Sequence, residues 1–473
     1  MGKHKFLVNG EWRESSHSRV IINPYTNLPL GEVWQASKKD IDDAIAAAVA
    51  AFQQTRRLQA YERAEALSYI ANQIQSQAEE FARLIAAETG KPIAFSRSEV
   101  ERSVFTFRIA AEEAKRIEGS VLPLDLAAHS KNRLGITRRF PLGPVSAITP
   151  FNFPLNLIAH KVAPAIASGN TVVLKPSSNA PLTALLLGKI IDGSTLPKGA
   201  TNIIPCSSEE AGQLITDERI KLLSFTGSPT VGWEMKNRAG KKRVVLELGG
   251  NAGVIVDKDA DLDFAVPRIA AGSYGNAGQS CIAVQRILVH NDVYPEFERR
   301  FLKATAETIT GDPEIETTVV GPMIDESSAT KVEGWIREAV TAGARILIGG
   351  GRTGAMLQPT VLVNVKPDMK VSCQEVFAPV VTLERFGEFD EAIQKVNNSE
   401  FGLQAGVFSK NIDHIFKAFQ ELEVGGVIIN DYPTYRMDHM PYGGIKDSGF
   451  GREGVKYAIE EMTELKLMAI NLS

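Results

Sequence analysis

A cysteine placed among small residues is the first candidate for chemistry in this sequence. Cys281 ends the run Gly278-Gln279-Ser280-Cys281, and the residues before it, 270–280, are mostly small or polar. Glycines beside a thiol let main chain and substrate approach the sulfur closely. The thiolate is the reactive form, and main-chain N–H groups at a turn or helix start are expected to lower the pKa of Cys281. Read alone, the stretch fits a buried structural cysteine at least as well, because free cysteines are among the most buried residues.

Two further polar residues have positions that suit catalysis. Glu247 ends a strand-like run and precedes Gly249-Gly250, so it could serve as a general base whose pKa is raised by partial burial. A surface carboxylate at a strand end explains it equally well. Asn152 lies between two phenylalanines and could donate to a developing oxyanion, or it could satisfy the polar groups of a turn.

A nucleotide-binding turn is expected at 224–232, where a strand ends in Gly227-Ser228 and a helix begins. The N–H groups of that helix start and the Ser228 hydroxyl could hold a pyrophosphate. The pattern also fits an ordinary serine N-cap followed by proline. A formal G-x-G-x-x-G match at 449–454 is rejected as the dinucleotide site, because no strand precedes it and too little chain follows.

The elements that must position these residues alternate between strands and helices from Pro144 onwards. Continuous β-branched runs separated by helices predict a parallel sheet covered on both faces, with ligands at the carboxyl ends of its strands. The expected strands of the first sheet are 145–149, 171–175, 202–204, 221–226 and 243–246, with a helix near 209–215. A second α/β segment has strands at 253–256, 286–289 and 380–383, a helix that leads to Cys281, and helices near 294–310, 324–343 and 389–398.

The N-terminal part is predicted to be mainly helical. Ser37 with Asp40 approximates a capping box, one long helix is expected over 61–89 before Gly90, and another over 96–117. Residues 133–139 alternate as in a strand of a projecting hairpin, and 465–470 form a last strand.

Composition limits the partners. The chain has 473 residues, a net charge of −4 without basic or acidic blocks, and three widely spaced cysteines. We therefore expect two or three domains, no nucleic-acid partner, no disulfide framework and a reducing, cytoplasmic location. The start of the chain has no signal-type apolar core, and no run reaches the ~20 apolar residues that span a bilayer, so no membrane partner is expected.

Seven motifs, taken together and in order, point to one family. The motifs are Thr149-Pro150-Phe151-Asn152-Phe153-Pro154, Lys175-Pro176-Ser177, Phe225-Thr226-Gly227-Ser228, Leu246-Glu247-Leu248-Gly249-Gly250, Gly278-Gln279-Ser280-Cys281, Glu375-Val376-Phe377-Ala378-Pro379 and Pro441-Tyr442-Gly443-Gly444-Ile445-Lys446-Asp447-Ser448-Gly449. With these motifs the chain resembles the NAD(P)-dependent aldehyde dehydrogenase superfamily, from about Asn9 to the last strand.

The resemblance implies an α/β fold with three parts. A Rossmann-like parallel-sheet cofactor domain would comprise 1–120 and 141–246, with 440–462 packing back on it. A second α/β catalytic domain would comprise 247–439. A small β oligomerisation arm would comprise 121–140 and 463–473, and would build a homodimer or homotetramer.

The resemblance also implies roles for single residues. Cys281 is similar to the nucleophile that attacks the aldehyde, Asn152 with the Cys281 N–H to the oxyanion hole, and Glu247 to the base that activates water for thioester hydrolysis. The product would be a carboxylic acid, and no metal site is expected. The implied cofactor residues are Ile148, Thr149, Pro150, Phe151, Lys175, Ser177, Ser178, Gly212, Phe225, Gly227, Ser228, Val231, Leu248, Gly249, Glu375 and Phe377.

Three residues bear on which cofactor and which substrate the chain is expected to bind. Many NAD-preferring relatives carry a glutamate where this chain has Ser178, so the resemblance favours tolerance of NADP, because serine would not repel a 2′-phosphate. Arg108 and His160 fall where some relatives contact polar aldehydes, and a solvated arginine and a core histidine are the alternatives. A small polar aliphatic or semialdehyde-type substrate is expected.

Three other functions are consistent with parts of the sequence. A CoA-acylating aldehyde dehydrogenase would share the first half-reaction, but such relatives usually lack the glutamate seen as Glu247. A cysteine hydrolase would need a histidine partner for Cys281. A non-catalytic structural relative would not need Asn152, Glu247 and Cys281 together.

Overall fold

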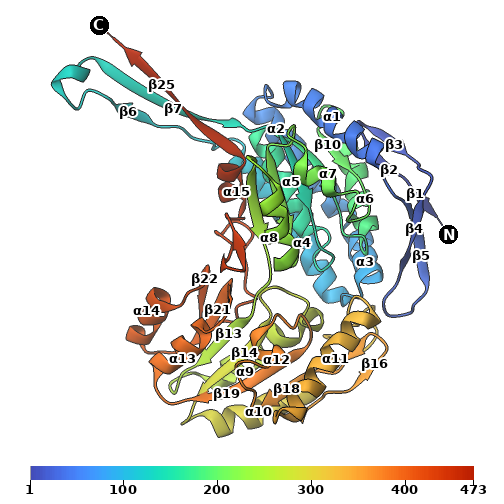
Figure 1. Ribbon diagram of the computed structural model, residues 1–473, viewed down its shortest axis with the longest axis vertical. Coiled ribbons are helices and arrows are strands. Elements are labelled where there is room, and N and C mark those ends of the chain that lie inside the picture. The colour runs from blue at the N-terminus through green and yellow to red at the C-terminus, as the bar shows by residue number, and fades with distance from the viewer. Residues whose placement is uncertain (1, 473) are drawn as a thin grey trace.

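The computed structural model describes residues 2–472, which form two lobes and an arm that projects from one of them (Figure 1). The N-terminal lobe holds most of the chain before residue 250, and the second lobe holds most of the chain between 250 and 430. Within residues 2–472, no helix combines the length and the apolar character that crossing a bilayer requires.

The first lobe is built on an eight-stranded sheet in the order β24-β12-β11-β8-β9-β10-β2-β3. The five central strands run parallel, and β24, β2 and β3 pair antiparallel at the two edges. The strands are β2 (Phe6–Val8), β3 (Glu11–Arg13), β8 (Pro144–Ile148), β9 (Thr171–Lys175), β10 (Thr201–Ile203), β11 (Leu222–Thr226), β12 (Arg243–Glu247) and β24 (Gly449–Phe450). Each strand expected from 145 to 246 is present within one or two residues of its expected bounds.

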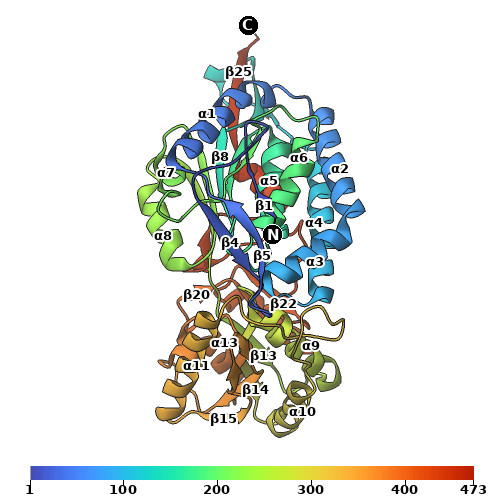
Figure 2. The same cartoon turned by 90° about the vertical axis from the view of Figure 1, so that its right-hand side faces the viewer.

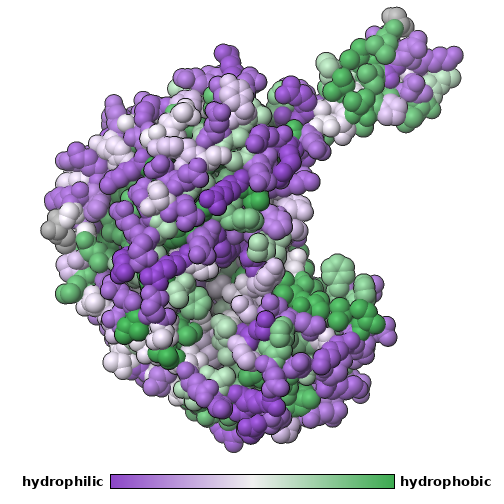
Figure 3. All heavy atoms as spheres, turned by 180° about the vertical axis from the view of Figure 1, so that it is seen from behind, coloured by the Kyte–Doolittle hydropathy of each residue, from purple (hydrophilic) through white to green (hydrophobic). Residues whose placement is uncertain are grey.

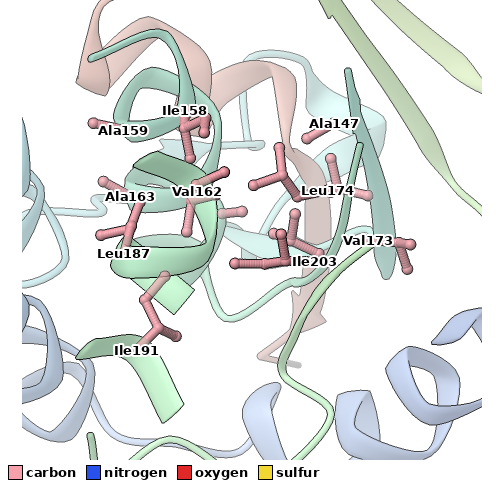
Figure 4. Packing of buried hydrophobic residues seen from close by; sticks show 14 of the residues in the cluster. Ala147, Ile158, Ala159, Val162, Ala163, Val173, Leu174, Leu187, Ile191 and Ile203 are labelled. Carbon is pink, nitrogen blue, oxygen red and sulfur yellow. The ribbon is translucent and has the colours of Figure 1, made fainter. Parts of the chain in front are cut away.

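Helices cover both faces of this sheet, with α7 and α8 on one side and α2 to α4 on the other (Figure 2). Their bounds are α1 (Lys38–Thr55), α2 (Ala60–Ser76), α3 (Ala78–Thr89), α4 (Ile93–Glu113), α5 (Asn156–Ser168), α6 (Pro181–Asp192), α7 (Gly212–Thr216) and α8 (Pro229–Arg238). The capping box at Ser37 and Asp40 is confirmed. Helix α5 is buried along its whole length, and its apolar residues pack with α6, β8, β9 and β10 (Figure 4).

The single helix predicted over 61–89 is wrong, because the chain forms two helices that meet at Gln77. Its φ of −111° and ψ of 22° leave the helical region. The apolar stripes of both helices pack into the same core, so the helical spacing of apolar residues continues across the break. Glutamine is a good helix former, and neither glycine nor proline marks the site. The helix predicted over 96–117 is displaced toward the N-terminus and follows Pro92, which suits a helix start.

The second lobe is built on a seven-stranded sheet in the order β15-β18-β19-β14-β13-β21-β22. All of its strands run parallel except β15. The strands are β13 (Ala252–Val256), β14 (Val284–His290), β15 (Arg345–Ile348), β18 (Thr360–Val363), β19 (Val380–Phe386), β21 (Gln404–Phe408) and β22 (Gly426–Ile429). The helices are α9 (Leu262–Tyr274), η2 (Gly275–Gly278), α10 (Tyr294–Ala306), α11 (Glu326–Thr341), α12 (Lys370–Cys373), α13 (Phe389–Asn397) and α14 (Ile412–Glu421). The expected α/β fold class with two parallel-sheet lobes is therefore confirmed.

The arm is a three-stranded antiparallel sheet in the order β25-β7-β6 (Figure 1). Its elements are β6 (Val121–Pro123), η1 (Ala128–Ser130), β7 (Arg133–Pro141) and β25 (Thr463–Asn471). Strands β7 and β25 pair along their full lengths, from Thr463 opposite Pro141 to Asn471 opposite Arg133. Helix α15 (Val455–Glu461) precedes β25 and packs on α5 of the first lobe.

Shorter strands complete the chain. β1 (Lys3–His4), β4 (Ser18–Ile22) and β5 (Pro29–Trp34) form a small sheet near the N-terminus. The remaining strands pair in twos: β16 (Arg352–Thr353) with β17 (Met356–Leu357), and β20 (Phe401–Gly402) with β23 (Ile445–Lys446).

Candidate active site

A cavity of about 360 Å³ lies where the two lobes meet. The first lobe contributes the carboxyl ends of β8, β11 and β12, as expected for ligand sites of parallel sheets. The second lobe contributes the loop after η2, the loop after α12 and the start of α11. Further lining residues come from α4, α5 and the loop after β22. The cavity brings together three residues singled out from the sequence, namely Cys281, Glu247 and Asn152.

The loop that carries Cys281 depends on close main-chain contacts. Gly278 has a φ of +67°, and a Cβ at this position would overlap the carbonyl oxygen of Ala378. A Cβ on Gly250 would overlap the carbonyl oxygen of Cys281 itself. Glycine is needed at both positions, so the motif around Gly249-Gly250 and the motif around Cys281 fit against each other.

The Cys281 thiol is protonated in its resting environment. Burial raises the pKa of Cys281 to about 12, and the hydrogen bond between Cys281 and Tyr442 offsets this only in part. The expectation of a lowered pKa is therefore wrong. Cys281 follows a 3₁₀ turn and does not lie at a helix start, so no helix dipole compensates for the burial of the sulfur.

Glu247 ends β12 with its side chain directed into the cavity region and only 2% exposed. Neither of its carboxyl oxygens has a hydrogen-bond partner among the described residues. Burial, and then the negative charge of Glu453, raise the pKa of Glu247 well above its ordinary value. A buried carboxyl without a protein partner is costly, and a water molecule or a ligand could satisfy it.

Asn152 lies beside the cysteine loop. Its Nδ2 donates to the Gln279 carbonyl oxygen at 3.0 Å, two residues before Cys281. A second Nδ2 hydrogen is available, because an amide nitrogen carries two. The loop that holds Asn152 is anchored by Glu99, which accepts hydrogen bonds from the N–H groups of Leu155 and Asn156.

Seven side chains form what we call the charged cluster: Arg102, Asn156, His160, Lys161, Arg436, Asp438 and Glu453. In one half, Asp438 accepts from Arg102 Nη2 at 2.7 Å and from Asn156 Nδ2 at 3.0 Å. His160 Nε2 lies 2.8 Å from the same carboxylate. Burial alone would raise the pKa of Asp438, but the hydrogen bonds from His160 and Arg102 outweigh it and hold the pKa well below its usual range.

In the other half of the charged cluster, Glu453 accepts from Lys161 Nζ and from Arg436 Nη2, both at 3.1 Å. These two cations hold the pKa of Glu453 below its ordinary value despite complete burial. The guanidinium groups of Arg102 and Arg436 both line the cavity.

A second group, the strand-end set, lines the cavity without ion pairs. It consists of Pro150, Phe151, Gly227, Ser228, Leu248, Gly249, Glu375 and Phe377, all of them implied cofactor residues. Glu375 accepts a hydrogen bond from the Gly250 N–H at 2.9 Å, and burial raises the pKa of Glu375 to about 7. Phe377 has a φ of +54° and packs edge-on against Phe151, with ring centroids 6.1 Å apart.

The strand-end set fits a dinucleotide. Ser228 is the N-cap of α8 but makes no side-chain capping bond, so its hydroxyl and the helix N-terminus are both available to a phosphate. The hydroxyl oxygens of Thr149 and Thr226, at the carboxyl ends of β8 and β11, are buried and have no partner in the described chain. The other implied cofactor residues do not line the cavity: Ile148, Thr149, Lys175, Ser177, Ser178, Gly212, Phe225 and Val231.

Neither residue predicted to contact substrate lines the cavity. Arg108 lies on the exposed face of α4, outside the lining. Six positions along a helix turn the side chain by about 240°, so Arg102 faces the cavity and Arg108 faces away. His160 is buried behind the wall, where it contacts Asp438. The predicted pair Arg108 and His160 is therefore not brought to the cavity wall, whereas Arg102 and Arg436 lie there.

Several residues at the site were not identified from the sequence. Arg102, Arg436, Asp438, Lys161, Glu453 and Tyr442 come from segments that are distant along the chain. No local spacing marks the first five, since each is an ordinary charged residue until the fold buries it. Tyr442 lies within a quoted motif, but its hydroxyl contact with Cys281 depends on tertiary structure.

The chain is similar to known proteins over nearly its whole length. A model described as the aldehyde dehydrogenase family matches residues 12–468. A 3-sulfolactaldehyde dehydrogenase of Priestia aryabhattai is 47% identical over 471 residues, covering 99% of this chain and 98% of that protein.

Two solved structures are similar in fold and sequence. Aldehyde dehydrogenase 21 from Physcomitrella patens, in complex with the reaction product succinate, has a TM-score of 0.98 and 46% identity, covering 99% of this chain and 98% of that one. A glyceraldehyde-3-phosphate dehydrogenase from Methanocaldococcus jannaschii, complexed with NADP, has a TM-score of 0.93 and 41% identity, covering 97% and 100%.

Proposed function

This chain belongs to the aldehyde dehydrogenase family, and we propose that Cys281, Glu247 and Asn152 are the residues with which it oxidises an aldehyde to a carboxylic acid. The observation that carries this proposal is their convergence on one cavity, in which the Glu247 carboxyl is buried and has no partner in the described chain.

Each residue has a definite part in the chemistry. The Cys281 thiolate adds to the carbonyl carbon, and the oxygen that becomes negative accepts a hydrogen bond from Asn152 Nδ2. The strand-end set would hold a nicotinamide cofactor, which would supply the acceptor for the hydride lost from that carbon. Loss of the hydride leaves a thioester on Cys281. Glu247 then removes a proton from water, which attacks the thioester, and the thiolate leaves as the carboxylic acid forms.

The unpartnered Glu247 also bears on the choice of acyl acceptor. A carboxylate beside a thioester can accept a proton from water and so activate that water for attack. Transfer of the acyl group to CoA does not need such a base. Its position favours hydrolysis over CoA acylation. A strict CoA requirement with an acyl-CoA product would reverse this choice.

The charged cluster favours an anionic aldehyde. Arg102, Arg436 and Lys161 are cations, and Asp438 and Glu453 are anions. Burial lowers the pKa of His160 and raises that of Glu247, so it disfavours the charged form of both side chains. The three cations exceed the two anions of these ion pairs by one charge, and a substrate with one negative charge would balance it. The Priestia relative is named for 3-sulfolactaldehyde, and the Physcomitrella structure contains succinate. Both are small anionic molecules.

We propose that the cofactor site tolerates NADP. Lys175 ends β9 and Ser178 follows it, and Arg19 reaches this region, where its Nη2 donates to Asn179 at 2.9 Å. Burial and, less strongly, the charge of Arg19 lower the pKa of Lys175. Two cations and a serine hydroxyl suit a 2′-phosphate. The Methanocaldococcus structure holds NADP.

We propose that the arm joins copies of this chain in a homodimer or homotetramer. Leu465, Leu467 and Met468 of β25 are each more than half exposed, as are Val121 and Leu126 beside them. Figure 3 shows apolar residues gathered on the arm and on the second lobe across from it, where Phe416 and Phe419 of α14 are exposed. Exposed apolar patches of this kind mark protein contacts. The three free cysteines support a reducing location such as the cytoplasm.

The proposed function is tested with matched aldehydes. Three aldehydes of similar length, carrying a carboxylate, a sulfonate or no charge, are each assayed with NAD⁺ and NADP⁺, and reduction of the cofactor is followed. We expect both anionic aldehydes to exceed the uncharged one in kcat/KM by about 10-fold or more. Cys281→Ala should abolish all of these activities. Equal kcat/KM for charged and uncharged aldehydes would contradict the substrate class, and an active Cys281→Ala would contradict the mechanism.

A further inference from the structure

A tyrosine side chain forms a hydrogen bond with the Cys281 sulfur. Tyr442 Oη lies 3.1 Å from Cys281 Sγ. Its ring is held from two directions. Arg436 places its guanidinium 3.6 Å from the ring centroid, and the main chain of Tyr442 exchanges two hydrogen bonds with Glu453, at 3.0 and 2.7 Å. Tyr442 is only 3% exposed, so its hydroxyl has little freedom to move away from the sulfur.

The direction of this hydrogen bond depends on the charge of the sulfur. When Cys281 is a neutral thiol, either group can donate. When Cys281 is a thiolate, the phenol alone has a proton to donate. Burial raises the pKa of Tyr442 well above its ordinary value, so the phenol keeps its proton at neutral pH.

The other charged groups around Cys281 oppose one another. Arg436 stabilises a thiolate, whereas the carboxyl groups of Glu375 and Glu247 disfavour it wherever they are ionised. The Tyr442 hydroxyl is the neutral donor in this group, and it touches the sulfur directly. A hydrogen bond to an ionised acceptor is roughly twice as strong as one between neutral groups.

We propose that Tyr442 is a further catalytic residue, whose hydroxyl donates to the Cys281 thiolate and stabilises it both before attack and when it leaves the acyl intermediate. The inference rests on the proposed role of Cys281 as nucleophile. No proton passes to or from the phenol: the thiol proton is lost to solvent or to a base, and the O–H bond of Tyr442 stays intact. When the sulfur becomes bonded to carbon it carries no charge, and the hydrogen bond is weakened. It strengthens again as the thiolate leaves.

A packing role predicts a different outcome from a hydrogen-bonding role. Tyr442→Phe keeps the ring and its contact with Arg436, and removes only the hydroxyl. A matched control is Tyr274→Phe. Tyr274 is also fully buried, and its hydroxyl lies 3.0 Å from Thr305 Oγ1 in the core of the second lobe, outside the cavity lining. Both variants lose one buried phenol hydroxyl, but Tyr442→Phe alone loses a contact with the thiol.

The test is the rate at which iodoacetamide alkylates Cys281 between pH 7 and 10, followed on the Cys281 peptide by mass spectrometry. Loss of a hydrogen bond to an ion lowers the thiolate fraction about 10- to 100-fold, and the greater reactivity of a more basic thiolate offsets part of this. We therefore expect alkylation to slow about 3- to 10-fold in Tyr442→Phe and to stay unchanged in Tyr274→Phe. Removing a hydroxyl also opens space for the reagent, so steric relief would act in the opposite direction.

Alkylation of Tyr442→Phe as fast as, or faster than, that of the wild type would overturn the inference. An equal slowing in Tyr274→Phe would also overturn it, because the effect would then be one of general packing. Failure of the nucleophile assignment is seen separately: alkylation of Cys281 in the wild type would then leave aldehyde oxidation intact, whatever the rates in the two variants.

Discussion

Two groups of residues at the cavity, one lining it and one lying partly behind its wall, are built in different ways. The strand-end set consists of glycines, aromatic rings and main-chain groups at the ends of β8, β11 and β12, with Glu375 held by a main-chain N–H. The charged cluster consists of side chains from α4, α5, the loop after β22 and the loop after β24, held together by ion pairs and hydrogen bonds. The first group takes its shape from the main chain, and the second takes its charge from side chains.

This difference indicates how each group recognises its ligand. Main-chain groups and helix starts bind phosphates of any nucleotide of the right shape, and they change little when single side chains are replaced. A cluster of paired arginines can select a substrate by charge, and it can be altered by one substitution. Activity with the cofactor is therefore expected to change little when single side chains of the proposed cofactor site are replaced, whereas one replacement in the proposed substrate site is expected to change substrate choice.

The largest effect is expected for Glu247→Gln. The amide cannot take a proton from water, so steady-state turnover should fall about 10²- to 10⁴-fold. The first hydride transfer does not need this base, so a rapid burst of about one reduced cofactor per active site should remain. Stopped-flow absorbance of the cofactor measures both phases. Turnover within a few-fold of the wild type would contradict the role of Glu247.

The next largest effect is expected for Arg102→Gln. Loss of one charged contact should lower kcat/KM for an anionic aldehyde about 10- to 100-fold, and change an uncharged aldehyde much less. Arg108→Gln, which removes the same charge from the exposed face of the same helix, should leave the ratio of the two kcat/KM values as it is. A larger change of this ratio in Arg108→Gln than in Arg102→Gln would refute the assignment.

A smaller effect is expected at the cofactor site. Ser178→Glu places a carboxylate near the expected position of the 2′-phosphate, so kcat/KM with NADP⁺ should fall about 10-fold. The value with NAD⁺ should stay within about 2-fold and acts as the internal control. If Ser178→Glu lowers both values equally, Ser178 does not distinguish the two cofactors.

The smallest effect is one on stability. The pKa of Glu375 is raised to about 7 in the folded chain, whereas an unfolded glutamate titrates near 4.5. The folded state binds more protons between these values, so the free energy of unfolding falls as pH rises from about 5 to 7. In Glu375→Gln this decline should be smaller, and Tm measured at pH 5 and pH 8 should differ by a few degrees less than in the wild type. An unchanged difference would show that Glu375 does not titrate in this range.

The parts of the site that could be predicted from the sequence are those set by local main-chain geometry. The strand ends that carry Asn152, Ser228 and Glu247 follow from alternating strands and helices, because parallel strands bring their carboxyl ends to one edge. The glycines at 249–250 and 278 mark close contacts of the main chain, and the structure has both.

The parts that could not be predicted depend on which side chains the fold buries together. Arg102 and Arg108 lie on one helix and look alike in sequence, and only the orientation of α4 separates them. The break at Gln77 and the raised pKa of Cys281 have the same origin. At Gln77, tertiary packing overrides the helix propensity of glutamine. At Cys281, burial raises the pKa by more than the N–H groups of the turn lower it.

The central claim is that oxidation proceeds through an acyl group on Cys281 that Glu247 helps to hydrolyse. It is tested most directly by mixing Glu247→Gln with an anionic aldehyde and NADP⁺, quenching in acid, and mapping the modified peptide by mass spectrometry. The account predicts one acyl group per chain, on Cys281, which disappears when Cys281 is also replaced by alanine. The account would be contradicted if Cys281 were unmodified after the enzyme had released its reduced cofactor. It would also be contradicted if another residue carried the acyl group.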